Sequence, residues 1–87
     1  MNIYVGNLSY KVNEEDLEEI FKEYGSVNAC RIITDKLNGR SRGFAFVEME
    51  NQEHANKAIS ELNGSSYENQ DMIVYQAKPK TANYKRL

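Results

Sequence analysis

Apolar and polar positions divide the chain into segments with two different periods, and the shorter period predicts four β-strands. These strand segments are residues 3–6, 27–34, 42–49 and 72–77, which are alternating or rich in β-forming residues. Between the second and third, Asn38 and Gly39 carry a turn signal. We therefore expect those two strands to pair as an antiparallel hairpin.

Two other segments carry the period of an amphipathic helix. In the first, Asn13 is the predicted N-cap, Gly25 ends the helix, and the apolar stripe consists of Leu17, Ile20, Phe21 and Tyr24. In the second, Asn51 is the predicted N-cap, Asn63-Gly64 mark the end, and the inward stripe consists of Ala55, Ala58, Ile59 and Leu62.

The resulting order is strand, helix, strand, strand, helix, strand, which predicts an α+β fold of the ferredoxin-like βαββαβ type. Its four-stranded antiparallel sheet has both helices packed on one face. We expect one domain over residues 1–80, followed by a short basic C-terminal tail over residues 81–87. The other face of the sheet is then left without a helix to cover it.

The third strand segment places aromatic residues on that uncovered face. One set of alternate residues is small or aliphatic and suits the core: Gly43, Ala45, Val47 and Met49. The other set must then face solvent: Arg42, Phe44, Phe46 and Glu48. Two exposed phenylalanines after a basic residue are typical of surfaces that hold single-stranded nucleic acid by stacking, at about 1–3 kcal/mol per base.

The same alternation assigns residues of the other strands to the open face. On the first strand these are Tyr4 and Gly6, and Gly6 is expected to keep the face low enough for a base to approach. On the second and fourth strands they are Arg31, Ile33, Tyr75 and Ala77. The predicted face therefore carries up to four aromatic rings.

The composition limits the classes of protein that remain. Hydrophobic residues make up 40% and charged residues 28% of the 87 residues, which is ordinary for a soluble globular domain. No run approaches the roughly 20 apolar residues that a membrane span needs, and no secretory signal is visible, so we expect a cytoplasmic protein. The single cysteine, Cys30, is expected to be a buried structural thiol, and His54 is the only histidine, so we expect no metal site and no cofactor.

The net charge of −2 argues against a nucleic-acid partner until its distribution is considered. Residues 14–23 contain six acids and one lysine, a local charge of −5, while the last ten residues carry +4. The remaining basic residues that matter cluster around the middle strands, at Arg31, Lys36, Arg40 and Arg42. The negative net charge therefore conceals a separation between an acidic helical segment and basic residues elsewhere in the chain.

Two sequence motifs resemble those of the RNA recognition motif family. Residues 42–49 match the RNP1 pattern K/R-G-F/Y-G/A-F-V-x-F/Y at every fixed position except the last, where Met49 replaces an aromatic. Residues 3–8, Ile-Tyr-Val-Gly-Asn-Leu, resemble RNP2. Residues 62–64 and 77–79 resemble the family's usual sequence around the fourth strand, so the resemblance covers essentially the whole chain. The compact chain looks like the small single-domain members found in bacteria.

The resemblance implies roles for individual residues. Tyr4 would stack one base and Phe46 the next, while Phe44 would contact sugars and Arg42 a phosphate. Tyr75 would widen the platform. The remaining candidates for contacts with RNA are basic: Arg31, Lys36, Arg40, Lys78 and Lys80.

Two residues depart from a simple RNA-binding strand. Met49 is expected to point to the core, where a flexible thioether replaces an aromatic ring with modest loss. Glu48 lies on the binding face and would repel a phosphate above it, or would accept a hydrogen bond from a base edge.

The sequence therefore predicts a binder of single-stranded RNA, with single-stranded DNA left open, acting as a post-transcriptional regulator or RNA chaperone. The alternative is a protein-interaction module of the same fold that uses the acidic helix or the sheet face. Acylphosphatases share the strand order, but residues 7–11 offer no arginine for a phosphate loop and no nucleophile with a base is present. We therefore expect no enzymatic activity.

Overall fold

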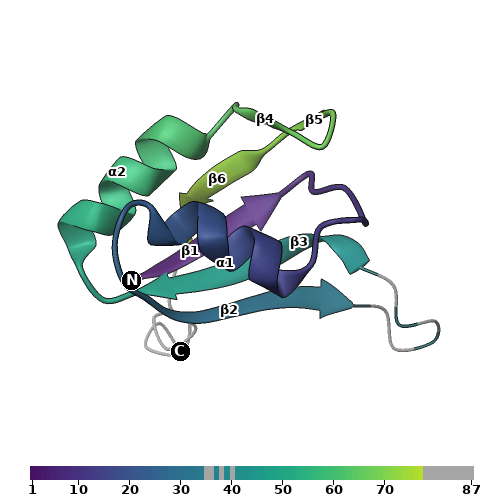
Figure 1. Ribbon diagram of the computed structural model, residues 1–87, viewed down its shortest axis with the longest axis horizontal. Helices are drawn as coiled ribbons and strands as arrows, with labels where there is room; N and C mark the ends of the chain where they lie inside the picture. Colours follow the sequence, from purple (N-terminus) through teal and green to yellow (C-terminus); the bar gives the residue numbers. More distant parts are fainter. Residues whose placement is uncertain (35–36, 38, 40, 78–87) are drawn as a thin grey trace, which may run out of the picture.

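Two helices and six strands make up the part of the chain that the computed structural model describes, residues 1–34, 37, 39 and 41–77 (Figure 1). In chain order they are β1 (Asn2–Gly6), α1 (Glu14–Lys22), β2 (Val27–Thr34), β3 (Ser41–Met49), α2 (Gln52–Leu62), β4 (Ser66–Tyr67), β5 (Gln70–Asp71) and β6 (Ile73–Gln76).

Four of the strands form one antiparallel sheet in the order β2-β3-β1-β6. The central strand β1 places Val5 opposite Ala45 of β3 and opposite Val74 of β6. Figure 1 shows α1 crossing in front of this sheet with α2 on the same side. The predicted ferredoxin-like arrangement is confirmed, including the pairing of β2 with β3.

The hydrophobic core lies between this face of the sheet and the two helices. Alternate residues of β1 and β3 have no solvent exposure: Ile3, Val5, Ala45, Val47 and Met49. The helices contribute side chains that are just as buried, Leu17, Phe21, Ala55 and Ala58. The prediction that Met49 faces the core is confirmed.

Both helices begin at the predicted residues because side-chain caps satisfy backbone N–H groups that would otherwise lack partners. Asn13 Oδ1 accepts a hydrogen bond from the Asp16 backbone N–H at 2.8 Å, and the Asp16 carboxylate lies 3.5 Å from the Asn13 backbone nitrogen. Asn51 Oδ1 accepts from the His54 backbone N–H at 2.9 Å in the same way.

A short hairpin, β4–β5, lies between α2 and the last strand of the sheet and was not predicted. Its turn residues Glu68 and Asn69 have positive φ values of 52° and 67°, as the tight turn of a two-residue hairpin requires. Met72 belongs to this connection, because its N–H donates to the Ser65 carbonyl and its carbonyl accepts from the Gly64 N–H, both at 2.8 Å. The last strand therefore runs over 73–76 and is shorter than the predicted 72–77.

Each edge strand of the sheet has a backbone amide bound by a side chain from the helical layer. Glu14 Oε2 accepts from the Ile32 N–H of β2, and Asn63 Oδ1 accepts from the Val74 N–H of β6, both at 3.0 Å. Bound amides make an edge a weaker template for pairing with another strand. Within the described residues, no helix or further strand covers the broad face opposite the helices.

Candidate nucleic-acid interface

Four residues from four strands form a single row across the open face of the sheet. The register places Arg31 of β2 opposite Phe46 of β3, Phe46 opposite Tyr4 of β1, and Tyr4 opposite Tyr75 of β6. Directly opposed side chains of antiparallel strands are close neighbours. The sequence predicted that these residues share a face, and the strand order now aligns them in one row.

The rings of Tyr4, Phe44, Phe46 and Tyr75, named here the aromatic cluster, pack around Tyr4. The Tyr4 and Tyr75 rings are stacked with their centroids 4.7 Å apart, and Tyr4 and Phe44 are stacked at 5.8 Å. Phe46 meets Tyr4 edge-on at 5.9 Å and Phe44 edge-on at 6.1 Å. Stacked and edge-to-face pairs at these separations stabilise one another beyond simple burial.

The aromatic cluster remains accessible to solvent. Phe46 is 39% exposed and Tyr75 is 50% exposed, whereas Tyr4 and Phe44 are partly covered by their neighbouring rings. Ile73, 49% exposed, lies opposite Gly6 and extends the apolar surface along β6. Sequence reasoning missed Ile73, although the two-residue period counted back from Tyr75 would have assigned it to this face.

Gly6 lies directly beneath the ring of Tyr4. A Cβ atom at this position would lie 2.6 Å from the Cε2 and hydroxyl atoms of Tyr4, so the Tyr4 ring itself fills the space above the glycine. The expectation that Gly6 keeps the face low enough for a base to approach stays a prediction. The absence of a side chain at Gly6 leaves room for the Tyr4 ring in the position where it stacks on Phe44 and Tyr75.

Backbone and side-chain hydrogen bonds hold the strand ends beside the aromatic cluster. The Gly43 carbonyl accepts from the Leu8 N–H at 2.9 Å, which joins β3 to the segment after β1. Asn7 donates from Nδ2 to the Asp71 carbonyl at 2.7 Å, and Gln70 Nε2 donates to the Asn7 carbonyl at 2.9 Å. The unpredicted hairpin thus fixes the end of β1, and no motif in the sequence signals this link.

Only part of the predicted basic set is described by the structure. Arg31 is exposed beside Phe46. Arg42 belongs to β3, but its side chain lies outside the described part of the chain. The other predicted phosphate contacts lie outside the described residues altogether: Lys36, Arg40, Lys78 and Lys80. Their roles, like those of the aromatic residues, remain predictions.

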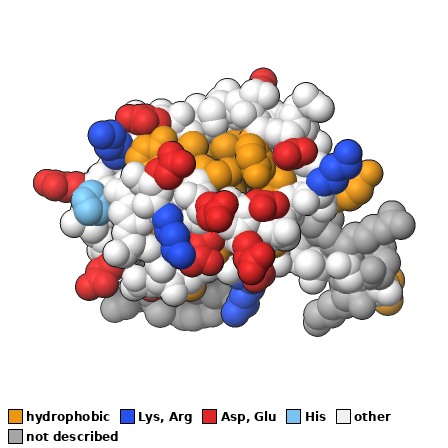
Figure 2. Space-filling view, viewed as in Figure 1, with side chains coloured by type: hydrophobic (Ala, Val, Ile, Leu, Met, Phe, Trp, Pro, Cys, Tyr) orange, Lys and Arg blue, Asp and Glu red, His pale blue; other side chains and the backbone are white. Residues whose placement is uncertain are grey.

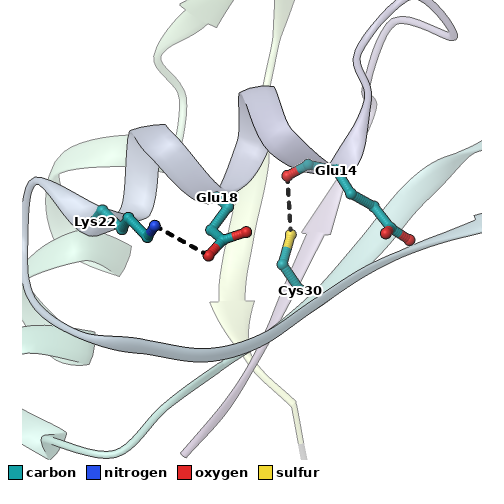
Figure 3. Close-up of polar contacts among 4 residues, drawn as sticks. All are labelled: Glu14, Glu18, Lys22 and Cys30. Atoms are coloured by element: carbon teal, nitrogen blue, oxygen red, sulfur yellow. Dashed lines mark hydrogen bonds and ion pairs between the residues drawn. The ribbon is translucent and has the colours of Figure 1, made fainter.

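The opposite side of the molecule is acidic. Figure 2, viewed with the helices toward the reader, shows carboxylate side chains spread over the region of α1. Lys22 forms an ion pair with Glu18 at 3.3 Å, one turn apart on the outer surface of α1 (Figure 3). The face that carries the helices therefore has the sign of charge that repels phosphate.

Cys30 belongs to β2, and its side chain points toward α1 on the covered side of the sheet (Figure 3). It is half-buried, and its thiol donates to the Glu14 carbonyl with a sulfur–oxygen distance of 3.6 Å. Burial, aided by the carboxylates of Glu14 and Glu18, raises the pKa of the Cys30 thiol to about 11. The prediction of a structural thiol fits this position, although burial is only partial.

Within the described residues, no group of three or more histidine, cysteine or acidic side chains is placed to hold a metal ion. In the same part of the chain, neither helix is long and apolar enough to cross a membrane.

Comparison with known proteins points to one family. The sequence profile of the RNA recognition motif matches residues 3–72. The protein named "Putative RNA-binding protein RbpF" from Nostoc sp. is 50% identical over 80 residues, which cover 92% of this chain and 76% of that protein.

Solved structures agree. The crystal structure of RNA binding protein PG1 matches with a TM-score of 0.87 at 50% identity, covering 92% of this chain and 99% of that one. A Sxl-lethal protein/RNA complex matches with a TM-score of 0.83 at 42% identity, over 87% of this chain and 47% of that chain.

Proposed function

This chain belongs to the RNA recognition motif family, and on that premise we propose that it binds single-stranded RNA by stacking bases on the aromatic cluster. The observation that carries the proposal is the row of Phe46, Tyr4 and Tyr75, which is accessible on a sheet face that no helix covers. Base stacking on an aromatic side chain contributes about 1–3 kcal/mol. The names of the relatives, which describe RNA-binding proteins, point in the same direction.

The arrangement of the rings supports a division of roles among them. Phe46 and Tyr4, neighbours across β1 and β3, take successive bases, while Phe44 contacts the sugars between them. Tyr75 exposes half its surface at the far end of the row and extends the platform toward β6. Such a row holds about two to four nucleotides, in keeping with the two or three bases that sheets of this type stack.

Charge supplies the second part of the interaction. Arg31 is exposed at the β2 end of the row, where it can donate to a backbone phosphate. The basic residues Lys36, Arg40, Arg42, Lys78 and Lys80 are proposed to add phosphate contacts around the sheet. Each phosphate contact releases counterions, so affinity falls as salt concentration rises.

A binder of this kind acts on RNA without transforming it, as a post-transcriptional regulator or RNA chaperone in the cytoplasm. The family and the names of the relatives point to a binding domain rather than to an enzyme. The acidic surface of α1 favours a second candidate, a docking module for a basic protein partner. In that case the aromatic cluster would not be needed for binding.

The test is a titration of short single-stranded RNA pools at two salt concentrations, followed by fluorescence anisotropy. A Phe44→Ala, Phe46→Ala variant should bind at least about fivefold more weakly than the wild type, because one base-stacking surface and one contact with the sugars are lost. A Glu15→Ala, Glu19→Ala variant, altered on exposed positions of α1, is the matched control and should retain binding.

Two results would refute the proposal: no wild-type binding at low salt, or undiminished binding by a double phenylalanine variant whose circular dichroism is native. Matched DNA oligonucleotides run alongside show whether the 2′-hydroxyl contributes.

A further inference from the structure

A polar row borders the aromatic row on the open face of the sheet. The register places Glu48 of β3 opposite Asn2 of β1 on one side and opposite Ala29 of β2 on the other. All three residues are exposed. Glu48 follows Phe46 by two residues, so its carboxylate stands on the same face, roughly 7 Å further along the strand.

A carboxylate in this position needs an explanation, because it repels the phosphates of any RNA that crosses the sheet. No described residue forms an ion pair with Glu48, and its two cross-strand neighbours, Asn2 and Ala29, carry no charge. A negative charge beside Phe46 weakens binding of every RNA equally unless it makes a favourable contact with some of them.

The favourable contact available to a carboxylate is a donor on the edge of a base. Glu48 stands two residues along β3 from Phe46 on the same face, so a base stacked on the Phe46 ring can turn an edge toward it. Guanine carries two adjacent donors on its Watson–Crick edge, N1–H and N2–H, which match the two oxygens of a carboxylate. Cytosine and adenine offer an amino group alone, and the single N3–H of uracil lies between two carbonyl oxygens that a carboxylate repels.

Asn2 supplies the complementary group. It lies directly across from Glu48, where opposed Cβ atoms of antiparallel strands are about 4.5–5.5 Å apart. Its amide can donate to the guanine O6 oxygen, which adjoins N1 on the same edge. Donor and acceptors therefore stand side by side in the order that the edge of guanine requires.

We propose that Glu48 and Asn2 form a guanine-selective site, in which Glu48 accepts from N1–H and N2–H of the base stacked on Phe46 and Asn2 donates to O6. The inference rests on the proposed RNA binding and adds a base preference to it. A matched pair of hydrogen bonds to a base edge discriminates by roughly 5- to 100-fold.

The test compares hexauridine with hexamers in which one uridine at a time is replaced by one of five nucleosides: guanosine, cytidine, adenosine, inosine or 7-deazaguanosine. Inosine lacks the N2 amino group, whereas 7-deazaguanosine keeps the whole Watson–Crick edge. At the best position, the wild type should prefer guanosine over uridine by at least about fivefold and lose most of that preference with inosine. 7-Deazaguanosine should bind like guanosine.

Glu48→Gln should reduce the ratio of guanosine to inosine affinity, because Glu48 accepts from the N2–H that inosine lacks. Asn2→Ala should reduce the ratio of guanosine to adenosine affinity, because adenosine lacks the O6 oxygen to which Asn2 donates. Glu15→Gln removes the same charge from α1 and should leave both ratios unchanged. If Glu48→Gln strengthens all hexamers by one common factor, Glu48 acts only through phosphate repulsion and the inference is overturned. If the wild type binds none of the hexamers, the proposed function fails and the inference fails with it.

Discussion

The two faces of the sheet are built from the same strands but have opposite properties. Along β3, Ala45, Val47 and Met49 have no solvent exposure, while Phe46 between them is 39% exposed. Burying a phenylalanine fully would stabilise the fold by about 1.5–3 kcal/mol relative to leaving it exposed. The largest apolar side chains of the strand are thus left on the face where they contribute least to folding, which fits the proposed role in binding RNA.

Charge separates the two faces as well. The helical side carries the acids of residues 14–23, with a local charge of −5, and Figure 2 shows these carboxylates over α1. Phosphates are repelled from that side, while Arg31 stands on the other. The net negative charge of the chain is therefore compatible with RNA binding, because the sign of the local electrostatic field decides where a polyanion approaches.

The largest expected effect comes from truncating one side chain on each face of β3. Met49→Ala should lower the free energy of unfolding by about 2–5 kcal/mol, because it leaves a cavity in the core. Phe46→Ala, three residues earlier, should change stability far less and weaken RNA binding instead. Urea denaturation followed by circular dichroism, with anisotropy titrations on the folded fraction, measures both. Equal loss of stability in the two variants would contradict the division between faces.

Thiol chemistry provides a second contrast between adjacent residues of β2. The pKa of Cys30 is raised to about 11, so its thiolate fraction near pH 8 should be on the order of 100-fold lower than that of an ordinary cysteine. Alkylation by iodoacetamide should be slowed accordingly.

The matched control moves the thiol to the open face, as Ala29→Cys in a Cys30→Ser background, where the ordinary rate is expected. Because the folded pKa lies above the unfolded value, this thiol favours folding fully below about pH 8.5, and its contribution is lost as the pH rises toward 11. Rapid alkylation of native Cys30 at pH 8 would show that α1 does not cover it.

A smaller effect is expected at the glycine beneath Tyr4. Gly6→Ala places a Cβ 2.6 Å from the Tyr4 ring atoms and should tilt the ring away from Phe44 and Tyr75. We expect RNA affinity to fall by about 1 kcal/mol, roughly fivefold, through partial loss of one stack. The same substitution made in a Tyr4→Ala background should have almost no effect on affinity. An unchanged penalty there would mean that Gly6 acts independently of Tyr4.

The smallest effect concerns the acidic helix. Glu15→Gln with Glu19→Gln should raise RNA affinity by less than about 1 kcal/mol, because exposed charges on the far face act only through the long-range field. The gain should disappear at high salt. A large gain that persists in high salt would place RNA on α1 and contradict the comparison between faces.

Most of the fold could be predicted from the sequence because its signals are local. Asn13 and Asn51 mark helix starts through hydrogen bonds that span three residues, and the alternation in residues 42–49 assigns each side chain of β3 to a face. For the same reason, the alternation of side chains along each strand was enough to identify the four residues of the aromatic cluster.

The features that escaped prediction depend on contacts between distant segments. The β4–β5 hairpin is too short to show a period, and Asn7 contacts it across 64 residues of chain. The row from Arg31 to Tyr75 required the strand order, and the role of Gly6 required the tilt of the Tyr4 ring. The alternation of residues along a strand predicts which face of the sheet a side chain lies on, but not which side chains of other segments it contacts.

The most direct test of the central claim is nuclear Overhauser spectroscopy of the protein with a short single-stranded RNA, read out between base protons and side-chain protons. RNA binding on the open face predicts contacts from bases to the rings of Phe46, Tyr4 and Tyr75, and none to Ile20 or Tyr24 of the helical side. Contacts from base protons to Ile20 and Tyr24, without contacts to the aromatic cluster, would contradict RNA binding on the open face.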